Sequence, residues 1–139
     1  MKKNAAIPAA EALSDALSEF HQLGDEHLRG VGYVYDEKLL DQVILTFDQS
    51  RLVIWGEPDD DSIEFRVEPK NQDASVSAVD ASHFDHWKRL IGKHFGWGWI
   101  IMNQQGYCDG ILISFEDIDP QILFVVAASS LSVSTIGRV

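Results

Sequence analysis

The most reactive side chains of the sequence gather in one short segment, Gly106-Tyr107-Cys108-Asp109-Gly110. For Cys108 to act as a nucleophile, a base such as a histidine must lie within hydrogen-bond distance and the thiol pKa must be lowered. Asp-Gly is also a strong signal for a tight hairpin turn, which needs these residue types without any catalysis. The segment is therefore a candidate turn site with Tyr107, Cys108 and Asp109 as its chemical groups, and a plain hairpin turn is the competing interpretation.

A second group of ionisable residues is an acidic cluster of five carboxylates, formed by Glu57, Asp59, Asp60, Asp61 and Glu64. The order of ligands lacks the glycine and the terminal glutamate of an EF-hand loop, so no calcium loop is predicted. A solvated hairpin tip that discourages strand pairing would explain the cluster. The functional interpretation is a negative docking surface for a cationic partner.

Three histidines, His83, His86 and His94, could supply metal ligands. The spacing of three residues places the rings of His83 and His86 on nearly one face of a helix. A zinc site would need further ligands, for which the candidates are Asp80, Asp85 and Cys108. No recognised spacing such as H-E-x-x-H is present, so we predict no metal and no cofactor.

Three tryptophans, Trp87, Trp97 and Trp99, lie close together in the sequence. Packing in a hydrophobic core explains them adequately. The alternative is a ligand cleft lined by these rings, with polar anchors at Asn103, Gln104 and Gln105.

The charge of the chain is uneven, and this bears on its partners. Between Asp36 and Asp85 there are thirteen Asp or Glu residues against four Lys or Arg residues, which is nine of the eleven excess negative charges. From His86 onward acids and bases cancel. An acidic segment repels phosphate backbones, so we expect no nucleic-acid binding and an attraction for a basic partner protein.

Cysteine content and hydropathy indicate the compartment. Cys108 is the single cysteine, so no disulfide can form within the chain. The longest apolar run, Ile122 to Ala128, has seven residues, whereas a membrane-spanning helix needs about 20. No export signal is evident near Met1. We expect a soluble, cytoplasmic protein without a membrane anchor.

Hydrophobic periodicity predicts two helices, Ala9 to Leu23 and His83 to His94, the second with Ser82 as its N-cap. Runs of β-branched and aromatic residues predict strands, with a short additional one near Val76 and Val79. The predicted strands are Val31–Tyr35, Leu40–Phe47, Leu52–Trp55, Ile63–Val67, Trp97–Asn103, Ile111–Phe115, Ile122–Ala127 and Leu131–Ile136.

These elements predict one α+β domain over residues 1–139. We expect a curved, mainly antiparallel sheet of six to eight strands, with the two helices packed on a face. The two halves are faintly alike, since Ile44-Leu45-Thr46-Phe47-Asp48 resembles Leu112-Ile113-Ser114-Phe115-Glu116. This match hints at a duplication.

From Trp97 onward the sequence resembles a family of small bacterial proteins of unknown function. The likeness rests on Trp99, Asn103-Gln104-Gln105-Gly106-Tyr107, Asp109-Gly110, Phe115 and Ala128-Ser129. The resemblance implies no activity, cofactor or catalytic residue. In size and acidity the chain is also similar to immunity and antitoxin-type proteins of bacterial toxin systems.

The leading functional hypothesis is a non-enzymatic module that binds another protein through the acidic region between Asp36 and Asp85. The alternative is a small enzyme or ligand-binding protein that uses the turn at Tyr107, Cys108 and Asp109 together with a histidine. A third hypothesis is a homo-oligomer formed through an edge strand.

Overall fold

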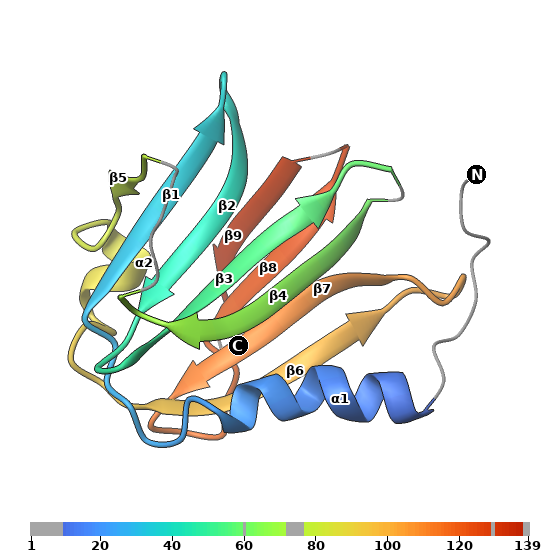
Figure 1. Ribbon diagram of the computed structural model, residues 1–139. Coiled ribbons are helices and arrows are strands. Elements are labelled where there is room, and N and C mark those ends of the chain that lie inside the picture. Colours follow the sequence, from blue (N-terminus) through green and yellow to red (C-terminus); the bar gives the residue numbers. More distant parts are fainter. Residues whose placement is uncertain (1–9, 60, 72–76, 129, 138–139) are drawn as a thin grey trace.

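The computed structural model describes residues 10–59, 61–71, 77–128 and 130–137, and it is built mostly of strands. Two four-stranded meanders follow one another, separated by a short strand and a short helix (Figure 1). In chain order the elements are α1 (Ala10–His21), β1 (Gly30–Asp36), β2 (Leu39–Thr46), β3 (Ser50–Glu57), β4 (Ser62–Pro69), β5 (Val79–Asp80), α2 (Asp85–Lys88), β6 (Phe95–Met102), β7 (Cys108–Phe115), β8 (Ile122–Ala127) and β9 (Ser130–Thr135).

The strands form two antiparallel sheets. The first has five strands in the order β4-β3-β2-β1-β5, and the second has four in the order β6-β7-β8-β9. The prediction of antiparallel strands and two helices is confirmed, but the single curved sheet of six to eight strands is wrong. Each meander has one apolar face, as in the alternating pairs Val43 and Leu45 or Ile111 and Ile113, all fully buried. Two such faces are hidden by packing on each other.

One hydrophobic core lies between the sheets and receives side chains from both. At its centre the rings of Phe47 and Phe115 stack with centroids 6.3 Å apart. These two rings come from the matching five-residue stretches, which end β2 and β7, the second strand of each meander. The resemblance seen in the sequence therefore corresponds to equivalent places in the two sheets.

Helix α1 contacts β4 and β6, one edge strand from each sheet, and so covers one open side of the sandwich (Figure 1). Phe20 stacks on Phe65 and Phe95 with centroids 4.6 and 5.9 Å away. A Cβ added at Gly98 would lie 2.6 Å from the Phe20 ring, so a glycine is required there. The predicted helix at Ala9 to Leu23 is confirmed, with its end two residues earlier.

The second helix is much shorter than the predicted His83 to His94, because α2 spans only Asp85–Lys88. Beyond it the backbone leaves the helix to pair with the segment before β1. The Leu28 N–H donates to Lys93 O (2.9 Å) and the Gly92 N–H to Leu28 O (2.7 Å). This pairing continues to a β-bridge between His27 and His94, and it ends the helix although the sequence pattern is helical.

The expected N-cap at Ser82 is also wrong. The residue that precedes α2 is Phe84, and no side chain caps the helix. The Ser82 hydroxyl instead accepts a hydrogen bond from the Val31 N–H, at 2.9 Å. Ser82 thus ties the segment before α2 to β1. Neither helix in the described ranges has the length and hydropathy to cross a membrane.

Candidate functional site

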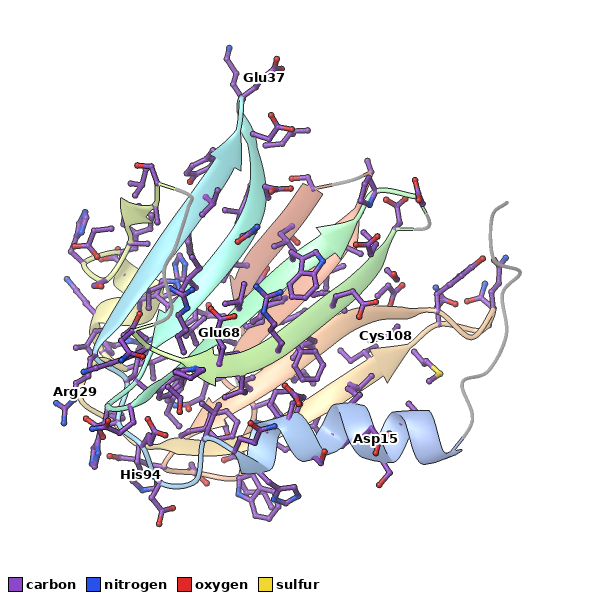
Figure 2. The ribbon with its side chains drawn as sticks, viewed as in Figure 1. Asp15, Arg29, Glu37, Glu68, His94 and Cys108 are labelled. Atoms are coloured by element: carbon purple, nitrogen blue, oxygen red, sulfur yellow. The ribbon has the colours of Figure 1, made fainter. Side chains whose placement is uncertain are left out.

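The predicted acidic cluster lies at the tip of the β3–β4 hairpin, with Asp60 outside the described residues. Asp59, Asp61 and Glu64 are exposed. The β1–β2 turn, which carries Asp36 and Glu37, lies at the same end of the first sheet, and Figure 2 shows Glu37 at its extreme tip. We call the six described carboxylates of these two hairpins the acidic end: Asp36, Glu37, Glu57, Asp59, Asp61 and Glu64.

Asp48 and Glu68 belong to the acidic segment but lie outside the two hairpin tips, and each is held by arginine. Asp48 accepts hydrogen bonds from the His27 N–H (2.8 Å) and the Arg29 Nε (2.7 Å). These contacts, the backbone bond first, hold the pKa of Asp48 well below its usual range.

Glu68 pairs with Arg51 and Arg66 on β3 and β4. Burial works to raise the pKa of Glu68, but hydrogen bonds from the two guanidinium groups outweigh it and lower the pKa. Three arginines of the first half are thus engaged by Asp48 and Glu68, away from the hairpin tips. Lys38 is the one basic residue within the two described hairpin turns of the acidic end.

The candidate turn at Tyr107, Cys108 and Asp109 is displaced from the position we predicted. The chain turns at Asn103 to Gly106, where Gly106 has φ 87°, and Cys108 already begins β7. The Asp109-Gly110 pair therefore lies in a strand rather than in a turn. A Cβ at Gly110 would lie 3.2 Å from the Ile101 Cδ1, so close strand packing, not turn geometry, accounts for this glycine.

Cys108 lacks the surroundings of a nucleophile. Burial raises the pKa of its thiol to about 11, and the charges of Glu64 and Asp109 act in the same direction. Asp109 accepts a hydrogen bond from the Asn103 amide at 3.2 Å rather than orienting a base. Cys108 is at the start of β7, and His86 is on α2. These two elements lie on opposite sides of the fold (Figure 1). Cys108 is therefore a neutral thiol at pH 7 without a histidine beside it.

The histidines do not form one cluster. His94 lies against His27, with ring centroids 6.1 Å apart, whereas His86 contacts Tyr33. Within the described ranges no group of three or more His, Cys, Asp or Glu side chains could hold a metal ion. The tryptophans also separate, since Trp87 is fully buried and Trp97 is 53% exposed.

The sequence did not reveal a hydrogen-bonded chain that joins β1 to α2. The Trp87 Nε1–H donates to the Tyr33 Oη at 2.7 Å, and the Tyr33 Oη lies 2.9 Å from the His86 Nε2. An indole N–H can only donate, so the Tyr33 oxygen accepts from Trp87. Among the described residues the Tyr33 hydroxyl has no acceptor other than the His86 Nε2, so we assign its hydrogen to that nitrogen. Burial raises the pKa of Tyr33, which keeps this hydrogen in place.

His86 is the outer member of this chain. Burial lowers the pKa of His86, against an opposing effect of the Asp85 charge. The ring is therefore neutral at pH 7, with Nε2 as the acceptor and the proton on Nδ1. Nδ1 has no hydrogen-bond partner in the part of the chain that the structure describes.

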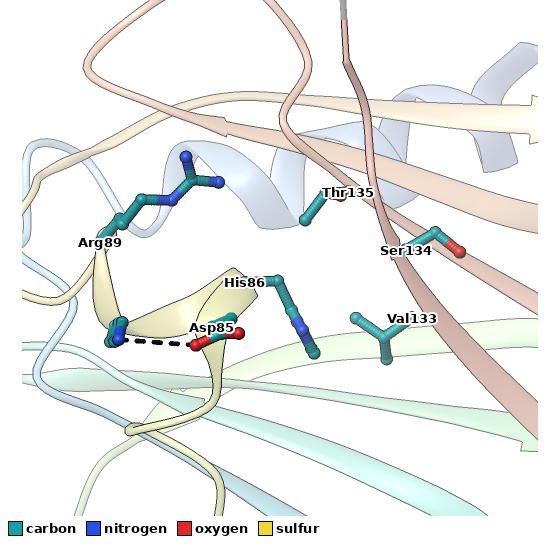
Figure 3. Close-up of a pocket in the computed structure, with 7 residues that line it drawn as sticks. Asp85, His86, Arg89, Val133, Ser134 and Thr135 are labelled. Carbon is teal, nitrogen blue, oxygen red and sulfur yellow. Dashed lines mark ion pairs between the residues drawn. The ribbon is translucent and has the colours of Figure 1, made fainter.

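His86 lines a cleft between α2 and β9, which Figure 3 shows in close-up. The cleft has a volume of about 640 Å³ and is lined by Asp85, His86, Lys88, Arg89, Val133, Ser134 and Thr135. A neighbouring hollow of about 250 Å³ shares His86, Arg89 and Thr135 and adds Lys93 and Gln121. The basic residues after Asp85 were visible in the sequence, but nothing there indicated that β9 would face them.

Comparison with known proteins places the chain in a family. No curated protein and no solved structure is significantly similar to it. A family model described as a family of unknown function, DUF6334, matches residues 13–139. The match spans both sheets, the acidic end and the cleft, and it agrees with the resemblance to a family of unknown function. The chain therefore belongs to the DUF6334 family of unknown function.

Proposed function

We propose that the protein is a non-enzymatic binding module that holds a basic segment of a partner protein at its acidic end. The observation that carries this proposal is the distribution of acidic and basic residues over the first sheet. Arg29, Arg51 and Arg66 are paired with carboxylates within the sheet or at its other end. The two hairpin tips keep six carboxylates against Lys38.

The physical basis is electrostatic complementarity. Exposed charges at a rim contribute little each, but a field of one sign speeds the approach of an opposite charge and disfavours acidic partners. Such binding weakens steeply with salt, because the Debye length falls from about 10 Å at 0.1 M to about 3 Å at 1 M. The proposal fits the similarity in size and acidity to immunity-type proteins, which act by binding rather than by catalysis.

Affinity capture from host extract, at low and high salt, tests the proposal. The Asp59→Asn/Asp61→Asn variant removes two charges from the tip, and asparagine tolerates the positive φ of Asp61 (54°). The matched control is Asp15→Asn/Asp25→Asn, which removes two exposed charges from α1 and its following turn.

We expect a basic partner that is captured at low salt, released at high salt, and bound about 3- to 10-fold more weakly by the tip variant. The control variant should bind as the unmodified chain does. A partner that ignores salt, or that both variants bind equally, would refute the acidic end as the docking surface.

Self-association is a second candidate, favoured by one observation. Trp97 lies on the edge strand β6, close to α1, and is 53% exposed. Large exposed aromatic side chains are enriched at protein interfaces. Light scattering of the chain and of Trp97→Ser should then give a dimer and a monomer, respectively. A monomer in both cases would remove this candidate.

A further inference from the structure

We propose that the cleft between α2 and β9 binds a small ligand through an oxyanion, a phosphate or carboxylate group. This inference concerns other residues than the acidic end and does not depend on the function proposed there. Four features of the cleft support it: its charge, a fixed N–H donor, polar groups on the facing strand, and its size.

The wall formed by α2 and the turn after it is basic. Lys88, Arg89 and Lys93 are three of the eight described Lys or Arg residues, and they fall within six positions. Lys88 pairs with Asp85 at 3.5 Å and Lys93 with Glu116 at 3.9 Å. Arg89 makes no ion pair with any described residue. At physiological salt the nearest charges dominate the potential, so this wall attracts anions although the whole chain is acidic.

The side chain of Arg89 extends along the cleft toward Thr135 (Figure 3). A guanidinium group presents paired N–H donors that match the two oxygens of a carboxylate or phosphate. Arg89 is exposed, so its guanidinium group is accessible to a ligand. Its lack of a carboxylate partner among the described residues leaves these donors available.

His86 adds a neutral donor with a defined orientation. The chain from Trp87 through Tyr33 assigns its Nε2 as the acceptor, so the Nδ1–H is left to donate. Because Trp87 is fully buried and Tyr33 is 5% exposed, the support beneath the ring is rigid. A preorganised donor of this kind costs little entropy when a ligand binds.

The opposite wall supplies further polar groups from β9 and from the residue before β8. Ser134 and Thr135 are exposed and are among the residues that line the cleft, and Figure 3 shows the Ser134 hydroxyl directed away from Arg89 and His86. The Gln121 Oε1 accepts from the Phe115 N–H at 2.6 Å, which leaves the amide NH₂ as a donor beside the hollow. Polar residues therefore line the cleft and the neighbouring hollow from both walls.

The size and lining of the cleft indicate a small ligand. A volume of about 640 Å³ falls within the range of about 300–1,000 Å³ usual for small-molecule pockets. No Phe, Tyr or Trp is among the described lining residues, whereas a nucleotide base is usually held by stacking on an aromatic ring. Leu90, Ile122 and Ile136 offer a short apolar surface in the neighbouring hollow. A small phosphorylated or carboxylated compound fits these properties better than a nucleotide.

NMR titration of the ¹⁵N-labelled full chain with inorganic phosphate, and separately with acetate, tests the proposal at constant ionic strength. The site variant is Lys88→Gln/Arg89→Gln. The matched control is Lys38→Gln/Lys70→Gln, which also removes two positive charges but from positions outside the cleft. Neither lysine makes an ion pair with a described residue. The amide spectra themselves report whether each variant is folded.

We expect saturable shifts of residues 85–93 and 133–136, and a change at the His86 Nδ1–H. Binding should weaken at least tenfold in the site variant and stay unchanged in the control. Saturation by phosphate alone assigns a phosphoryl ligand, and saturation by both anions assigns a general oxyanion site. No saturable shift below about 20 mM of either anion, or equal weakening in the control, would overturn the proposal.

Discussion

The two sides of the sandwich are closed in different ways. On one side α1, a helix of twelve residues, inserts Phe20 between Phe65 and Phe95. On the other side the helix has four residues, and the segment around it inserts Trp87 against Phe124, with ring centroids 6.1 Å apart. The first closure rests mainly on aromatic packing, with one hydrogen bond from the Val67 N–H to Glu19, whereas the second joins Trp87, Tyr33 and His86 in a chain of hydrogen bonds.

The two closures also differ in the surface that each leaves beside its helix. The amphipathic helix α1 borders a hollow of about 350 Å³, whereas the cleft beside α2 has a volume of about 640 Å³. A short helix held by a buried polar chain leaves room beside it, and every member of that chain must be satisfied because unpaired buried groups cost free energy. The larger of these two hollows lies beside the short helix α2, at the closure that contains the chain of hydrogen bonds.

The largest expected effect on stability comes from truncating the large aromatic side chain that fills either closure. Phe20→Ala and Trp87→Ala should each lower the free energy of unfolding by about 3–5 kcal/mol, because both side chains are almost fully buried. Urea denaturation followed by circular dichroism measures this. Trp87→Phe, which keeps most of the volume, should cost clearly less than Trp87→Ala. An α1 variant with no loss of stability would show that only the α2 side closes the core.

A smaller effect should distinguish the two closures. Tyr33→Phe removes the acceptor of the buried Trp87 N–H and the donor to His86, so it should cost about 1–3 kcal/mol. It should also release the His86 ring from its single tautomer, which ¹⁵N NMR of the imidazole reports. The control Tyr35→Phe alters a tyrosine that is 46% exposed and should change neither property. An unchanged tautomer in Tyr33→Phe would contradict the hydrogen-bonded chain.

The smallest effect concerns Cys108, the first residue of β7. Its pKa rises from 9.0 to about 11, so at pH 8 the folded chain should react with iodoacetamide roughly a hundredfold more slowly than the chain unfolded in urea. A raised thiol pKa contributes stability that is complete below about pH 9 and is lost as the pH rises through about 11. Mass spectrometry of alkylation against pH measures the rate. Rapid modification of the folded chain at pH 7 would revive the nucleophile hypothesis.

The strands were predictable because their signals are local. Alternation in Ile63 to Val67 and the apolar run from Ile122 to Ala127 each mark a strand that the structure contains, within two residues at either end. Helix α1 was predictable for the same reason, since Leu13, Leu17 and Phe20 share one face. Val79 lies in the short predicted strand, whereas Val76 is outside the described residues.

What the sequence did not show depends on contacts between distant segments. Periodicity around Trp87 predicts a long helix, but pairing of Leu28 with Gly92 and Lys93 ends it early. An apolar strand such as β8 suits one curved sheet as well as two packed ones. The contact of Tyr33 with His86 joins residues 53 positions apart, and no local pattern reports it. The candidate site was therefore the least predictable part of the molecule.

The sequential order of the strands has a consequence for synthesis on the ribosome. Apart from β1 and β5, every paired strand is adjacent in sequence to its partner, so each meander can zip up from local hairpins with low contact order. The last strand of the first meander ends at Pro69. The second sheet, which covers the apolar face of the first, ends 66 residues later, at Thr135. At a rate of synthesis of about 5–20 residues per second, the apolar face of the first meander stays exposed for roughly 3–13 s before the second sheet is complete. A nascent chain stalled in this interval should be a strong client for chaperones.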